Sequence, residues 1–171
     1  ETTDLPCWRH GEWLHLCSIA LSAEPSRTSA FTAMTAIRHA GGFVSFDPNI
    51  REDLWQDEHL LRLCLRQALQ LADVVKLSEE EWRLISGKTQ NDRDICALAK
   101  EYEIAMLLVT KGAEGVVVCY RGQVHHFAGM SVNCVDSTGA GDAFVAGLLT
   151  GLSSTGLSTD EREMRRIIDL A

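Results

Sequence analysis

The feature that most constrains this chain is the alternation of short apolar runs with longer amphipathic segments. Strand-like runs occupy residues 13–21, 43–47, 73–77, 105–110, 115–120 and 123–128. Helical periodicity and helix start or stop signals mark residues 26–40, 57–72, 79–86, 92–102, 141–152 and 160–171. Strands that alternate with helices of this length form βαβ units. The pattern therefore predicts an α/β fold with a mainly parallel central sheet and helices on both of its faces.

The composition is that of a globular domain. The chain has 171 residues, of which 46% are hydrophobic and 23% charged, and its formal net charge is −8. We interpret residues 1–171 as one domain, because we find no internal repeat, low-complexity tract or linker. The acidic balance and the lack of a Lys/Arg block argue against nucleic acid as a partner. No apolar run approaches the roughly 20 residues that span a bilayer, so we expect no membrane partner.

The cysteines and histidines indicate neither a disulfide framework nor a metal site. The cysteines are widely and unevenly spaced, so we expect all six to be reduced thiols in the core of a cytoplasmic protein. His125 and His126 are expected to lie on one strand and point to opposite faces, which argues against joint metal binding. The six cysteines are Cys7, Cys17, Cys64, Cys96, Cys119 and Cys134.

Polar or glycine-rich turns follow several of the predicted strands. In an open parallel sheet, ligands bind beyond the carboxyl ends of the strands, so these turns are expected to meet along one edge. Such a convergence indicates a ligand site more strongly than any single motif does. The four turns are DPNIR (47–51), SEEE (78–81, preceded by Lys76), TKGAEG (110–115) and DSTGAGD (136–142).

The GAGD turn admits two interpretations. Gly139 and Gly141 would leave the backbone N–H groups of a helix start open to a phosphate, where the helix dipole adds partial positive charge. Asp142, in the first turn, would then accept a proton from an attacking hydroxyl. Alternatively, Ser137 or Thr138 caps the helix, and the small residues only permit close packing. These residues alone favour neither interpretation.

The other three turns also have a structural and a functional interpretation. TKGAEG is either a tight link between strands or a surface for a nucleotide, with the Thr110 hydroxyl as a donor to phosphate. SEEE fits a capping box, with Ser78 as the N-cap and Glu81 reaching back to it, whereas the functional alternative puts Glu81 near a hydrated Mg²⁺. DPNIR is either a simple turn or a segment in which Arg51 donates to phosphate oxygens.

Several well-known site motifs do not occur in the sequence. There is no G-x-x-x-x-G-K-[ST] phosphate loop. Lys111 stands before a single glycine, which does not fit that motif. The lack of G-x-G-x-x-G after the first strand argues against a dinucleotide oxidoreductase, and the lack of G-x-S-x-G argues against a hydrolase. We expect Trp55 and Trp82 to pack in the core rather than to bind a ligand.

Taken together, these motifs resemble the PfkB, or ribokinase-like, family of sugar and nucleoside kinases. DSTGAGDAFVAGLL (136–149) is similar to the C-terminal signature of that family over its full length, and TKGAEG is similar to its nucleotide-contacting turn. DPNIR resembles the D-x-N-x-R segment of the family, and KLSEEEW (76–82) resembles its N-x-x-E motif, with Ser78 in place of Asn. The resemblance covers essentially the whole chain and is strongest to bacterial fructokinases associated with sucrose use.

The resemblance implies a three-layer α/β/α kinase fold and a defined reaction. The expected reaction is ATP-dependent phosphorylation of a primary hydroxyl, most closely that of D-fructose to give D-fructose 6-phosphate. Asp142 would be the base that takes the sugar hydroxyl proton. Gly139, Ala140 and Gly141 would supply the anion hole, and Arg51 would donate to the phosphate oxygens. This agrees with phosphoryl transfer, which mainly needs positioning and charge stabilisation.

The resemblance also implies positions for the cofactors. Ser78 would take the place of a nucleotide-contacting Asn, and Glu81 would hold Mg²⁺ through water. Asp136 and Thr138 match positions that bind a monovalent cation such as K⁺ in some members. The residues expected to contact ATP are Thr110, Lys111, Gly112, Ala113, Glu114 and Gly115, together with Gly141 at the phosphate end.

The chain departs from the family pattern at both ends. Family members have an N-terminal region with a di-glycine sugar-binding motif and a small β-sheet lid, whereas Gly41 and Gly42 here follow a helix as a stop signal. We therefore expect residues 1–171 to be the central and C-terminal part of one ribokinase-like kinase domain. The N-terminal lid region and the C-terminal helices would be missing, and the piece alone would be inactive.

Other functions are also consistent with these residues. Within the fold, the substrate could be another small sugar or riboside, such as ribose or aminoimidazole riboside. Outside it, the chain could be a nucleotide-binding module without catalysis, or a structural domain in which all four turns are incidental. Asp142 argues against a module that only binds phosphate, which gains nothing from a carboxylate there. The sequence does not decide between a monomer and a homodimer.

Overall fold

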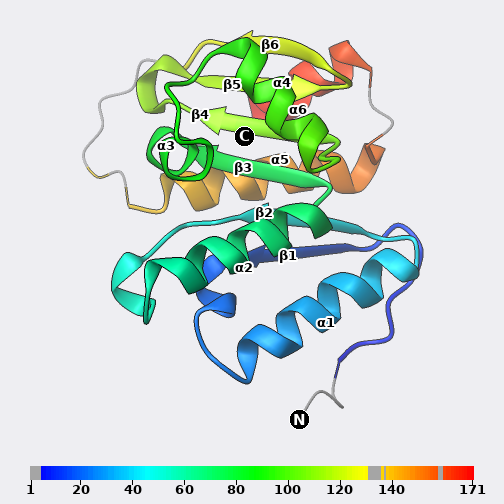
Figure 1. Ribbon diagram of the computed structural model, residues 1–171. Coiled ribbons are helices and arrows are strands. Elements are labelled where there is room, and N and C mark those ends of the chain that lie inside the picture. The colour runs from blue at the N-terminus through cyan, green and yellow to red at the C-terminus, as the bar shows by residue number, and fades with distance from the viewer. Residues whose placement is uncertain (1–4, 131–135, 137, 158–159) are drawn as a thin grey trace.

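The computed structural model describes residues 5–130, 136, 138–157 and 160–171. A six-stranded sheet runs through them in the order β1-β2-β3-β4-β5-β6 (Figure 1). β1 to β4 are parallel, and β5 and β6 extend the sheet as antiparallel strands, so the predicted mainly parallel sheet is confirmed. The strands are β1 (Trp13–Cys17), β2 (Phe43–Asp47), β3 (Val74–Ser78), β4 (Met106–Thr110), β5 (Val116–Tyr120) and β6 (Gln123–Phe127).

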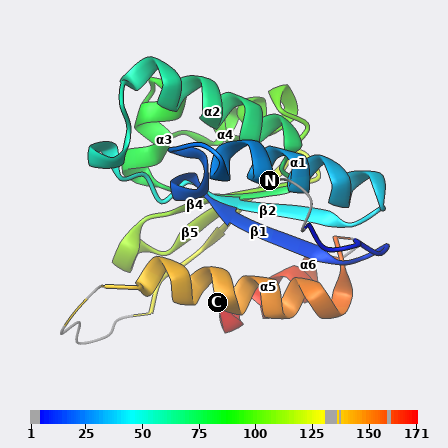
Figure 2. The ribbon, with the colours of Figure 1, turned by 90° about the horizontal axis from the view of Figure 1, so that it is seen from below.

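Helices cover both faces of the sheet, as predicted. Figure 2 shows α1 to α4 on one side and α5 and α6 on the other. Side-chain caps start four of these helices, because Asp57, Ser78, Asn91 and Asp160 each accept a hydrogen bond from a backbone N–H in the first turn. The helices are α1 (Ser26–His39), α2 (Glu58–Leu71), α3 (Glu79–Ser86), α4 (Asp92–Glu101), α5 (Ala140–Thr155) and α6 (Glu161–Leu170).

The sheet separates two hydrophobic cores because neighbouring strand residues point to opposite faces. Phe46 and Leu77 face α1 to α4 in the larger core, whereas Val74 and Leu108 face α5 and α6 in the smaller one. Trp82 is only 1% exposed and lies in the larger core, and Trp55 packs against that core. Both tryptophans therefore pack as predicted. Each fully buried large apolar side chain contributes on the order of 1.5–3 kcal/mol to stability.

The predicted hairpin between residues 115 and 128 is confirmed. Arg121 and Gly122 both have positive φ, which matches the tight turn that joins β5 to β6. The His125 Nδ1 atom lies 3.7 Å from Glu161 Oε1 of α6, and the His126 Nε2 atom lies 3.1 Å from Asp92 Oδ2 of α4, on the other side of the sheet. The two rings therefore point to opposite faces, as expected.

The predicted first strand is too long. It ends at Cys17, and Ser18–Leu21 form the 3₁₀ helix η2. β2, its pairing partner, also ends at Asp47, and the N–H of Ser18 donates to the carbonyl of Pro48 instead of continuing the ladder. An apolar run shows burial, but it does not show where strand pairing stops.

The prediction of six reduced core thiols is wrong for three cysteines. Cys96 on α4 and Cys119 on β5 form a disulfide, and Cys7 is exposed. α4 packs against β5, which brings the Cα atoms of Cys96 and Cys119 within 5.6 Å although the residues are 23 apart in sequence. Cys17 and Cys64 are free, whereas Cys134 lies outside the described residues.

Candidate active site

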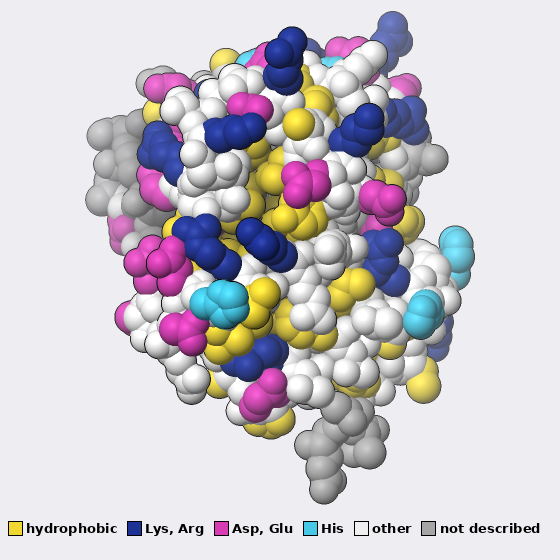
Figure 3. Space-filling model, in the orientation of Figure 1, with side chains coloured by type: hydrophobic (Ala, Val, Ile, Leu, Met, Phe, Trp, Pro, Cys, Tyr) yellow, Lys and Arg dark blue, Asp and Glu magenta, His cyan; other side chains and the backbone are white. Residues whose placement is uncertain are grey.

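Two of the four turns line a common pocket at the carboxyl ends of β2 and β3. The pocket has a volume of about 380 Å³, and its lining includes Asn49, Arg51, Lys76, Ser78 and Glu81. The expected meeting of the DPNIR and SEEE turns is therefore confirmed. Another pocket, of about 460 Å³, is lined by residues of α2 to α4 and the segment after α3, on the face drawn in Figure 3. The 460 Å³ pocket contains no residue from the end of a strand, so we place the candidate site at the 380 Å³ pocket.

Glu81 connects the two turns through its buried carboxylate. Ser78 accepts a hydrogen bond from the Glu81 N–H at 3.2 Å, and Glu81 Oε2 accepts one from the Ser78 N–H at 2.8 Å, so the capping box is confirmed. Glu81 Oε1 also accepts from the N–H of Ile50 at 3.0 Å. The carboxylate therefore fixes the start of α3 against the loop after β2.

Beside Glu81, Lys76 and Asp47 form a buried ion pair. The Lys76 Nζ atom lies 3.2 and 3.4 Å from the two carboxylate oxygens of Asp47, and the residues are 8% and 3% exposed. Burial raises the pKa of Asp47 above its usual value, and the Lys76 charge acts in the opposite direction. The sequence places Lys76 just before the SEEE turn, but it does not predict this pairing.

The TKGAEG turn lies next to this pocket. Thr110 pairs with Ser78 in the β3–β4 register, and its hydroxyl donates to the Leu77 carbonyl at 3.3 Å. Gly115 has φ +103°, and an added Cβ would lie 2.0 Å from the backbone oxygen of Phe127. Close packing therefore requires glycine at position 115, which supports the tight-turn interpretation for that residue.

The GAGD turn forms an open helix start. Gly139 is the N-cap of α5 with φ 77°, and no side chain caps the helix. The interpretation of Thr138 as the N-cap is therefore wrong, and Ser137 lies outside the described residues. Ala140 and Asp142 are exposed in the first turn, so backbone N–H groups at this positive end of the helix face an accessible surface.

Lys76 brings the GAGD turn and the pocket together. An ideal Cβ on Gly141 would lie 3.1 Å from the Lys76 Nζ atom. The ammonium thus lies against the first turn of α5 while it also lines the pocket of Arg51, Ser78 and Glu81. Through this contact, the fourth predicted turn reaches the same edge of the sheet.

His15 is a further polar side chain near this edge that sequence reasoning did not identify. It lies opposite Ser45 in the β1–β2 register, and its Nδ1 atom is 3.2 Å from the Ser45 hydroxyl. Loss of solvent contact lowers the pKa of His15, and the Asp142 carboxylate acts in the opposite direction. The sequence signal was a histidine within an otherwise apolar strand.

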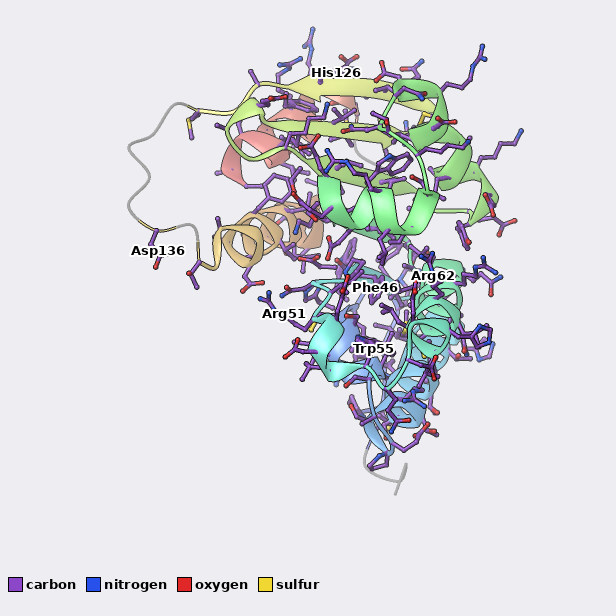
Figure 4. The ribbon with its side chains drawn as sticks, turned by 60° about the vertical axis from the view of Figure 1, so that its left-hand side comes forward. Phe46, Arg51, Trp55, Arg62, His126 and Asp136 are labelled. Atoms are coloured by element: carbon purple, nitrogen blue, oxygen red, sulfur yellow. A yellow bond between two sulfur atoms is a disulfide. The ribbon has the colours of Figure 1, made fainter. Side chains whose placement is uncertain are left out.

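The remaining predicted residues lie around this edge. Figure 4 shows Arg51 on the loop after β2, on the same side of the molecule as Asp136. Asp136 accepts a hydrogen bond from the Thr138 N–H at 2.8 Å, and this bond lowers the pKa of Asp136. In the TKGAEG turn, the N–H groups of Lys111, Glu114 and Gly115 all donate to backbone carbonyls of the same turn.

The described part of the chain contains no group of three or more His, Cys, Asp or Glu residues that could hold a metal ion. In that same part of the chain, no helix is both long and apolar enough to cross a membrane.

Comparison with known proteins identifies the family. Residues 7–169 match the pfkB family carbohydrate kinase domain. A fructokinase of Klebsiella pneumoniae is 58% identical over 157 residues, which are 92% of this chain and 51% of that protein.

Two solved structures share the fold over 99% of this chain. A fructokinase double mutant from Vibrio cholerae O395, in fructose, ADP and potassium ion bound form, has a TM-score of 0.92 at 39% identity, and 55% of it is covered. The aminoimidazole riboside kinase of Salmonella enterica, complexed with aminoimidazole riboside and an ATP analog, has a TM-score of 0.89 at 31% identity, and 56% of it is covered. The chain thus spans about half the length of these relatives. The match over residues 7–169 shows that it belongs to the PfkB family of carbohydrate kinases.

Proposed function

We propose that this chain carries the phosphoryl-transfer half of an ATP-dependent sugar kinase that converts D-fructose to D-fructose 6-phosphate. The observation that carries the proposal is the open start of α5, where Gly141, between Gly139 and Asp142 in the chain, lies beside the buried Lys76. The fructokinase at 58% identity supports fructose as the sugar. In this proposal, residues 1–171 form the central and C-terminal part of one kinase domain.

The chemistry follows from the groups at this edge. Backbone N–H groups of Gly139, Ala140 and Gly141 would bind the transferring phosphoryl group, helped by the dipole of α5. Asp142, exposed in the first turn, would accept the proton of the attacking sugar hydroxyl. Arg51, which lines the neighbouring pocket, would donate to phosphate oxygens.

The nucleotide would lie between the pocket and the TKGAEG turn. Ser78 lines that pocket, and Thr110 is its register partner. Thr110 would exchange its long bond to the Leu77 carbonyl for one to the nucleotide. The rest of the turn would supply the remaining contacts, through Lys111, Gly112, Ala113, Glu114 and Gly115.

Two cations complete the proposal. Glu81 would hold Mg²⁺ through water, because its carboxylate already accepts two backbone hydrogen bonds and is nearly buried. Asp136 and Thr138 would contribute to a K⁺ site. The Vibrio cholerae fructokinase solved with a potassium ion supports this second site.

A substrate panel on the full-length polypeptide tests the proposal. ADP release would be followed with D-fructose, ribose and aminoimidazole riboside, each with Mg·ATP and with or without K⁺. The proposal predicts the highest kcat/KM for D-fructose. Preferred turnover of aminoimidazole riboside would favour the function of the more distant Salmonella enterica relative. Binding of Mg·ATP without turnover of any sugar would favour a non-catalytic module.

Small-molecule sugar and nucleotide are the proposed partners, with neither nucleic acid nor membrane. We place the reaction in the cytoplasm because it uses ATP; the cysteines no longer support that location, since Cys96 and Cys119 are paired. Sedimentation of the full-length polypeptide would distinguish a homodimer from a monomer, between which the sequence does not decide.

A further inference from the structure

Buried polar side chains gather on the sheet face beneath the start of α5. Asp47 follows Phe46 and Lys76 follows Val75, and Phe46 and Val75 are register partners, so Asp47 and Lys76 leave the same face. Ser45 lies on that face too, because its register partner Val74 packs in the α5–α6 core. Most of the buried side chains around α5 and α6 are apolar, so this polar group requires an explanation.

Lys76 has more donors than Asp47 uses. An ammonium carries three N–H donors, whereas Asp47 offers two contacts, at 3.2 and 3.4 Å. The same ammonium is held against Gly141 and lines the pocket that contains Arg51 and Ser78. A full positive charge therefore lies directly behind the helix start that the proposed function assigns to the phosphoryl group.

Stability alone is a poor reason for this pair. Removing two charges from water costs several kcal/mol per ion, and apolar replacements of buried ion pairs are often neutral or stabilising. Apart from Lys76, β3 is apolar from Val74 to Leu77. An apolar residue at position 76 would continue the α5–α6 core.

We propose that Lys76 is a positioning residue of the phosphoryl-transfer site, anchored by Asp47. Its ammonium fixes the first turn of α5 at Gly141 and adds a whole charge to the partial charge of the helix end. The negative charge on the transferring group is thereby stabilised more than that on bound nucleotide. This inference rests on the proposed kinase function and deepens it.

The test uses the full-length polypeptide with the variants Lys76→Met, Lys76→Arg and the double variant Asp47→Asn/Lys76→Met. Lys88→Met is the matched control, because Lys88 is an exposed lysine with its own acidic partner, Asp94. We expect Lys76→Met to lower kcat roughly 10²-fold, as the loss of one preorganised donor does, with a much smaller change in the KM for ATP. Lys76→Arg should recover part of kcat, and the control should not change it.

The double variant separates charge stabilisation from structural support. Removing both charges should restore the resistance to unfolding that Lys76→Met loses, since it leaves no unpaired buried carboxylate. The low kcat should persist in the double variant. A double variant that regains the wild-type kcat would overturn the inference, because Lys76 would then only neutralise Asp47.

A binding measurement decides the matter without turnover. Mg·ADP with aluminium fluoride, which imitates the transferring group, should bind the wild type more tightly than Mg·ADP alone. Lys76→Met should shrink that difference, and an unchanged difference would overturn the inference. A wild type that turns over no sugar but shows this shrinkage would refute the proposed function alone. A wild type that binds no Mg·ADP would refute both.

Discussion

Replacing Glu81 with Gln tests how the site is held together. The Glu81 carboxylate is 8% exposed and accepts backbone hydrogen bonds from Ser78 at 2.8 Å and from Ile50 at 3.0 Å. An amide has only one oxygen, so Glu81→Gln can satisfy one N–H group and turns its own NH₂ toward the other. One part-buried N–H group is then left without an acceptor.

The cost follows from the number of bonds lost. A hydrogen bond to a charged group contributes about 1.5–3 kcal/mol, so Glu81→Gln should lower the free energy of unfolding by about 2 kcal/mol. Glu81→Ala loses both bonds and should lower it by about 4 kcal/mol on the same basis. Glu79→Gln is the control, because Glu79 is in the same first turn but only pairs with Arg83 at 4.0 Å.

Urea unfolding followed by tryptophan fluorescence measures these changes. Trp82 follows Glu81 directly and is 1% exposed, so its emission reports on the start of α3. The control should change the free energy of unfolding by no more than about 1 kcal/mol, the usual range for an exposed pair. If Glu81→Gln costs no more than the control, the claim that its carboxylate holds the two turns together is refuted.

Two further predictions use the same unfolding assay. Gly115→Ala should lower the free energy of unfolding by about 3 kcal/mol or more, because the new Cβ would meet the Phe127 backbone. Gly112→Ala, which has open space around it, should lower it by about 1–2 kcal/mol. Equal losses for the two variants would contradict this reasoning. Because lost solvent contact lowers the pKa of His15 below 6.5, the unfolded chain takes up that proton first and stability falls as pH drops below 6.5. His15→Asn should weaken this fall in stability below about pH 6.5, and an unchanged pH profile would count against it.

The sequence predicted the elements well where their periodicity is strong. All six helices and the hairpin at Arg121 and Gly122 are present, because apolar spacing and turn residues act locally. The error at Ser18–Leu21 arose because strand length depends on the partner, and β2 ends at Asp47. The Cys96–Cys119 disulfide depends on α4 packing against β5, which the spacing of cysteines does not reveal.

The site was predicted in outline, and its interior was not. Turn motifs after strands indicated where a ligand would bind, since the carboxyl ends of parallel strands share one edge. The Asp47–Lys76 pair depends on strand register, which brings together residues 29 apart in sequence. A lysine within an apolar strand was the available signal, yet without the register its partner could not be chosen.

The most direct test of the proposed kinase function is the kcat of Asp142→Asn in the full-length polypeptide with D-fructose and Mg·ATP. Asp169→Asn, an exposed aspartate on α6, is the control. We expect Asp142→Asn to lower kcat roughly 10²–10⁴-fold, the usual contribution of a general base, while the affinity for Mg·ADP changes little. A variant that turns over fructose as fast as the control would contradict the assignment of Asp142 as the base.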